Sequence, residues 1–169
     1  MVEIPKPENP MLNKDIPIES NSLSTEQWDA LRAIADVIIP PSAEYGIPGA
    51  GDEAICKNIL LDGQKRIDKI ALALDTLEQM ANDAHTNTFT SLTQAQREAV
   101  ALSFQNEHAD AANMLQLLAA QCYYRDDRVL LSLGMEARAP FPEGYEVDEG
   151  DWSVLDPVRR RPAFHRPVS

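Results

Sequence analysis

The residue types that most often perform chemistry are sparse in this sequence. His85, His108 and His165 are its only histidines. None has a Glu three positions earlier, so the E-x-x-H pairs of a di-iron helical bundle are missing. The sequence also has no H-E-x-x-H, no C-x-x-C and no G-x-S-x-G motif. We therefore predict no catalytic residue and no metal site, and we expect the first two histidines at the surface.

Three glycines in the stretch SAEYGIPGAGD could suggest a phosphate-binding loop. A dinucleotide-binding loop has the order G-x-G-x-x-G and lies between a strand and a helix. Here Gly46, Gly49 and Gly51 give G-x-x-G-x-G after a predicted helix, and no βαβ pattern follows. We therefore predict a tight turn followed by a helix that Asp52 caps, and no cofactor bound by this chain.

Charged side chains gather near the C-terminus. The acidic ones are Glu143, Glu146, Asp148, Glu149 and Asp151. Calcium prefers such oxygen clusters, but the D-x-D-x-D-G spacing of a calcium loop is missing. An acidic segment that faces solvent or a partner is the better interpretation. The block Arg159–Arg161 suits carboxylates across an interface, although acidic residues of the same segment could also pair with it.

Composition and charge limit the classes of partner. The chain has 169 residues and a formal net charge of −12, from 27 acidic and 15 basic side chains. This charge disfavours binding to nucleic acid and to anionic membranes. Cys56 and Cys122 are too few for a disulfide framework, and we expect both to be small buried apolar residues.

Apolar periodicity predicts an all-α fold, a small irregular bundle of about six helices in a domain over 22–134. An extended N-terminal arm (1–21) and a long extended C-terminal tail (135–169) flank it. Helices are expected from Ser24 to the Pro40–Pro41 stop, from Asp52 to Gly63, from Gln64 to about Ala84, from Thr93 past Phe104, from about His108 to Tyr124, and from Asp126 or Asp127 to Gly134. Ser24 with Gln27 and Thr93 with Gln96 form capping boxes.

Two finer expectations concern the second half of the bundle. The segment Thr86–Leu92 is predicted to be a polar link between helices. The helix that follows is predicted to carry the apolar residues Ala99, Val100, Leu102 and Phe104.

The stretch Tyr123–Arg166 is rich in prolines and in large apolar side chains. An inert disordered tail normally lacks such side chains, so these must be buried against this chain's own helices or against another protein. We favour another protein, because an extended segment suits a wrapping contact. The predicted interface residues are Tyr123, Tyr124, Arg128, Phe141, Tyr145, Trp152, Leu155, Pro157, Arg159, Arg160, Arg161 and Phe164.

Two blocks of sequence carry a family resemblance. YYRDDRV followed by GYEVDEGDWSVLDPVRRRP resembles the C-terminal signature of the gluconate 2-dehydrogenase subunit 3 family, and LRAIADVIIPPSAEYGIPGAGD resembles its first helix and loop. Most of the specificity lies in the C-terminal block. The resemblance implies a non-catalytic small subunit that binds and stabilises a large FAD-dependent dehydrogenase of the glucose–methanol–choline type. That partner would hold the FAD, oxidise a sugar, polyol or sugar acid, and pass electrons to a cytochrome or another carrier.

A free-standing helical enzyme or ligand-binding module, with a site that the sequence does not reveal, is the alternative. The first twenty residues, MVEIPKPENPMLNKDIPIES, lack an apolar signal core and the twin arginine that many members of the family carry. We therefore expect a cytoplasmic location, or a periplasmic one if an export signal has been removed.

Overall fold

The computed structural model describes residues 23–138, 141, 144 and 150–161. The chain divides into two compact units, Met1–Ala137 and Arg138–Ser169, which are considered separately below. The predicted N-terminal arm lies outside the described residues, as do the predicted interface residues Tyr145 and Phe164.

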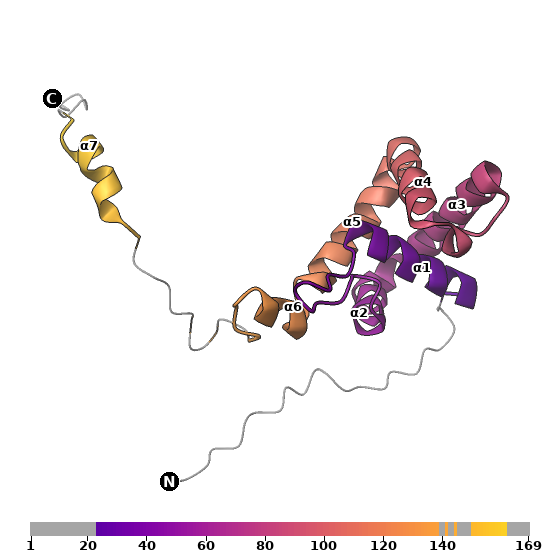
Figure 1. The fold of residues 1–169 in the computed structure, drawn as a ribbon, viewed down its shortest axis with the longest axis horizontal. Coiled ribbons are helices and arrows are strands. Elements are labelled where there is room, and N and C mark those ends of the chain that lie inside the picture. The colour runs from indigo at the N-terminus through magenta and orange to yellow at the C-terminus, as the bar shows by residue number, and fades with distance from the viewer. Residues whose placement is uncertain (1–22, 139–140, 142–143, 145–149, 162–169) are drawn as a thin grey trace, which may run out of the picture. The chain divides into compact units, whose positions relative to one another are not determined.

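Helices make up the first unit, which agrees with the predicted all-α bundle (Figure 1). They are α1 (Thr25–Ile38), α2 (Glu53–Gly63), α3 (Ile67–His85), α4 (Gln94–Glu107), α5 (Ala109–Tyr123) and α6 (Asp127–Ser132). Two short 3₁₀ helices, η1 (Gln64–Arg66) and η2 (Phe89–Ser91), lie on either side of α3. The β-type pairing among the described residues is a single bridge between Ser42 and Ile47.

Local side-chain hydrogen bonds set the starts of the helices. Both predicted capping boxes are present, at Ser24 for α1 and at Thr93 for α4. The Asp52 carboxylate accepts hydrogen bonds from the amides of Ala54 and Ile55 and so caps α2, as predicted. These caps satisfy backbone amides that have no partner within the helix.

The hydrophobic core surrounds α5, which packs against α1, α2, α3 and α4. The apolar side of α5 is the predicted one: Ala112, Leu115, Leu118, Ala119 and Cys122 are all buried. Cys56 of α2 is also buried, and both cysteines are free thiols. Burial raises the pKa of Cys56 to about 12 and that of Cys122 to about 11, so both stay protonated at neutral pH. The prediction that they act as apolar core residues is confirmed.

The prediction of a polar link before α4 is wrong. The link is not simply polar, because Phe89 and Leu92 are buried in the core. In α4 only Val100 and Phe104 are buried, and Leu102 is 59% exposed. Positions 100 and 104 are one turn apart and lie on the same side of the helix.

The glycine-rich loop between α1 and α2 packs closely against α1. The amide of Gly51 donates to Asp36 Oδ1 at 2.8 Å, and Arg32 Nε donates to the Gly51 carbonyl at 3.0 Å. A Cβ atom at Gly51 would lie 2.3 Å from the Arg32 carbonyl oxygen, so no larger residue fits. This close approach accounts for the glycine, and the predicted structural turn is confirmed.

The described part of the second unit contains a short helical segment. It consists of η3 (Trp152–Leu155) followed directly by α7 (Asp156–Arg159). Pro157 lies in the first turn of α7, where its missing N–H would have no partner in any case. Part of the tail predicted as extended is therefore helical, because this proline starts a helix and does not interrupt one.

Candidate partner interface

The two adjacent tyrosines at the end of α5 have different environments. Tyr123 is 3% exposed and belongs to the core. Tyr123 was predicted as an interface residue, but in the isolated chain the last turn of α5 directs this side chain into the bundle. Tyr124 is more than half exposed, and its ring meets that of Tyr123 edge-on at a centroid distance of 5.2 Å. Of the pair, only Tyr124 is available to a partner.

Arg128, also predicted as an interface residue, binds two carboxylates of its own chain. Its Nη2 and Nη1 atoms lie 2.7 and 3.2 Å from the Asp52 carboxylate oxygens. Its Nε and Nη2 atoms each lie 2.9 Å from oxygens of Asp126. Asp126 also accepts from the Arg128 amide and so caps α6. Arg128 therefore joins the N-terminal caps of α2 and α6, and we call this group the Arg128 clamp (Arg128, Asp52 and Asp126).

The clamp is electrostatically favourable for all three side chains. The hydrogen bonds from Arg128 lower the pKa of Asp52 and of Asp126 below their ordinary value, although partial burial opposes this. Each carboxylate also lies at a helix N-terminus, where negative charge is stabilised. The Arg128 side chain is 48% exposed, and four of its five N–H donors are engaged by Asp52 and Asp126. It joins α6 to the start of α2, and its role at an interface stays a prediction.

Removing the Arg128 side-chain charge should destabilise the protein in a pH-dependent way. We expect Arg128→Met to lower the free energy of unfolding by about 1 kcal/mol at neutral pH, because the pairs are partly exposed to solvent. A lowered carboxylate pKa stabilises the fold above the unfolded value of 3.8. That stabilisation disappears as the pH falls below 3.8 and through the lower folded-state pKa.

Urea unfolding at neutral pH and near pH 3 would measure this difference. Lys57→Met is the matched control, because Lys57 forms one exposed ion pair with Glu53 within α2. It should cost about 0.5 kcal/mol or less. If Arg128→Met lowers the free energy of unfolding by the same amount at both pH values, the clamp does not stabilise the protein through its charges.

Exposed apolar side chains lie in helix α6, which the Arg128 clamp holds, and next to it in the sequence. Only Val129 of α6 is buried. Tyr124, Leu131, Leu133 and Met135 are each half exposed or more, and we call these four side chains the α6 face. Figure 1 shows α6 beside the loop that joins α1 to α2, which is also where Asp52 meets Arg128. Exposed apolar side chains, where they form a contiguous patch, are typical of a protein-binding surface.

The sequence prediction missed most of the α6 face. Leu131, Leu133 and Met135 were not among the predicted interface residues. A helix of six residues buries one side, so apolar residues beyond that side must be exposed. The surplus of leucines over buried positions in this short helix is the signal that could have revealed the face.

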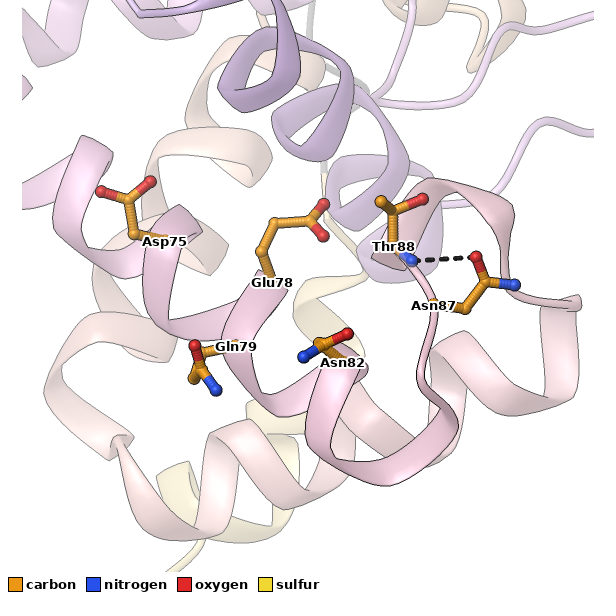
Figure 2. A pocket seen from close by; sticks show the side chains of 6 residues that line it. All are labelled: Asp75, Glu78, Gln79, Asn82, Asn87 and Thr88. Carbon is orange, nitrogen blue, oxygen red and sulfur yellow. Dashed lines mark hydrogen bonds between the residues drawn. The ribbon is translucent and has the colours of Figure 1, made fainter.

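A polar hollow of about 320 Å³ lies between α3 and the link that follows it. Asp75, Glu78, Gln79, Asn82, Asn87 and Thr88 line it, as Figure 2 shows. Its carboxylates already hold the fold together. Glu78 Oε2 accepts from the Phe89 amide at 3.0 Å, and Asp75 Oδ1 accepts from Gln27 Nε2 at 2.8 Å. Because these carboxylates already accept hydrogen bonds within the chain, we interpret the hollow as part of the fold and not as a ligand site.

The described residues also contain neither a cluster of metal-ligating side chains nor a helix suited to crossing a membrane. No group of three or more His, Cys, Asp or Glu side chains among them could hold a metal ion. Within the same residues, no helix is both long and apolar enough to cross a membrane.

The sequence of this chain is similar to that of a known protein family. The family model described as gluconate 2-dehydrogenase subunit 3 matches residues 25–137. The chain belongs to this family. No curated protein and no solved structure matches this chain. The resemblance seen in the sequence is therefore confirmed, and subunit 3 is by its description one component of a dehydrogenase complex that contains a larger subunit.

The subunit 3 match covers the bundle and not the second unit. It begins at the first residue of α1 and ends at the boundary between the two units. The Arg128 clamp and the α6 face both lie inside the matched range. The C-terminal block, which we expected to carry most of the specificity, lies mainly beyond it.

The predicted interface residues of the second unit remain predictions for this subunit 3 chain. Phe141, Trp152, Leu155 and Pro157 are exposed, as are the arginines of the block Arg159–Arg161. Nothing contradicts a role for them at an interface.

Proposed function

We propose that this subunit 3 chain binds and stabilises a large FAD-dependent dehydrogenase subunit and contributes no catalytic group of its own. In this proposal the partner holds the FAD and oxidises a sugar, polyol or sugar acid. Electrons then pass from the partner to a cytochrome or another carrier. The family match over the whole helical bundle supports the assignment to such a complex.

The α6 face is the observation that carries the proposal. Four large apolar side chains in α6 or within three residues of its ends stay exposed, although the same chain buries a hydrophobic core. Leaving them in water is unfavourable, at roughly 25 cal/mol for each Å² of apolar surface. The large subunit would cover them, and the Arg128 clamp would hold α6 in a fixed position for this contact. A pre-ordered surface loses little conformational freedom on binding.

Co-expression with the large dehydrogenase subunit of the same organism tests this proposal. We expect the large subunit to be soluble, FAD-bound and active when this chain is present, and less soluble without it. After the two subunits are separated, the flavin absorbance should follow the large one. Flavin or dehydrogenase activity that stays with this chain would refute the proposal.

A further inference from the structure

We propose that the helical segment Trp152–Arg161 is a second binding element, which docks into an apolar groove with an acidic rim on the large dehydrogenase subunit. This inference rests on the proposed function, because it adds a second contact to the same complex. It concerns the unit that the family match does not cover.

The segment is already helical without a partner. Asp151 Oδ1 accepts from the Ser153 amide at 2.9 Å and caps its first turn. At the other end, the amides of Arg160 and Arg161 donate to the carbonyls of Asp156 and Val158, each at 3.1 Å. Pro157 fixes the backbone in the first turn of α7. A segment that is ordered beforehand loses less conformational entropy when it docks.

One side of this segment carries an apolar stripe. Trp152, Leu155 and Val158 follow one another at intervals of three residues. In a 3₁₀ helix residues i and i+3 eclipse each other, and in an α-helix they are neighbours. Trp152 is 63% exposed, which leaves its large ring available for contact. Val154 is 68% exposed but is two positions from Trp152, so it lies away from the stripe. An apolar stripe on one side of a helix fits a groove.

Neither of two hollows among the described residues of the first unit suits the Trp152 ring. The apolar hollow between α1, α4 and α5 has a volume of only about 20 Å³, which is too small for an indole. The larger hollow is lined by acidic and amide side chains, as Figure 2 shows, so it does not suit an apolar ring. Neither hollow is therefore the groove that we propose.

The arginines beside the stripe define the chemistry of that groove. Arg159 Nη1 lies 3.5 Å from Asp156 Oδ1, and this pair is exposed. Arg160 and Arg161 make no ion pair with any of the described residues. Three guanidinium groups next to an apolar stripe suit carboxylates at the edge of a groove, because their geometry matches carboxylate oxygens. Such rim charges mainly increase the rate of association.

The test measures the affinity of the full-length chain for the purified large subunit, with single substitutions on the two sides of the segment. Trp152→Ala should weaken binding by at least about 30-fold, because buried tryptophans are typical interface hot spots. Val154→Ala is the matched control and should change the affinity by about twofold or less. Arg160→Gln combined with Arg161→Gln should slow association and reduce its dependence on salt.

The outcomes separate this inference from the proposed function. If the unchanged chain does not bind the large subunit, the proposed function fails. If it binds but Trp152→Ala has no larger effect than Val154→Ala, only the second binding element is refuted. Thermal unfolding of each variant alone provides the remaining check. A lower unfolding temperature for isolated Trp152→Ala would mean that the ring packs on this chain's own helices, and this would also overturn the inference.

Discussion

Replacing Phe89 with alanine should lower the free energy of unfolding by about 3–5 kcal/mol. Phe89 is fully buried, and its short helix η2 packs against α1 and α3. The substitution removes an aromatic ring from a closed core and leaves a cavity, which neighbouring side chains fill only in part. A small domain is stable by only about 5–15 kcal/mol, so this loss is a large fraction of the total.

Leu102→Ala is the matched control for this prediction. It also removes apolar atoms, but Leu102 is mostly exposed on α4. Leucine and alanine both favour helices, so the expected change is about 0.5 kcal/mol or less. Urea unfolding of both variants measures the two values. Similar losses for both variants would contradict the core described above.

Replacing Leu131 and Leu133 together with glutamine should weaken binding to the large subunit by about 30- to 100-fold. Each leucine is at least half exposed and would be buried in the complex. Burying one such side chain contributes about 1.5–3 kcal/mol when it is complete, and the surface already covered reduces this figure. Glutamine adds no charge and is compatible with a helix, so the isolated chain should keep its stability.

The control for the α6 face is Leu72→Gln, which replaces a comparably exposed leucine on α3. It should leave the affinity within about twofold of the unchanged chain. Titration calorimetry with the large subunit compares the variants. If Leu72→Gln weakens binding as much as the double substitution does, the α6 face is not the specific contact.

Much of the bundle could be predicted because local interactions determine it. Ser24, Thr93 and Asp52 cap helices through amides two or three residues away, so the sequence contains both partners of each bond. The stripe of α5 follows from spacing alone, because this central helix packs on several neighbours.

The errors arise where contacts distant in the sequence decide the outcome. Phe89 is a single aromatic residue in a polar link, and only the packing of η2 against α1 and α3 reveals that it is buried. Arg128 meets Asp52 across a separation of 76 residues. The sequence predicted Arg128 as an interface residue and gave no sign of this pairing. Tyr123 and Tyr124 are adjacent, but successive residues of a helix point in different directions. The first side chain therefore lies in the core and the second at the surface.

The central claim is that this chain stabilises a large flavoprotein by binding it. Thermal unfolding of the purified large subunit, followed by the release of its FAD, tests this claim most directly. With this chain present at about 100 times its dissociation constant, binding to the folded state should add about 2.7 kcal/mol of stability. The unfolding temperature of the flavoprotein should therefore rise. An unfolding temperature that stays unchanged at saturating concentrations of this chain would contradict the account.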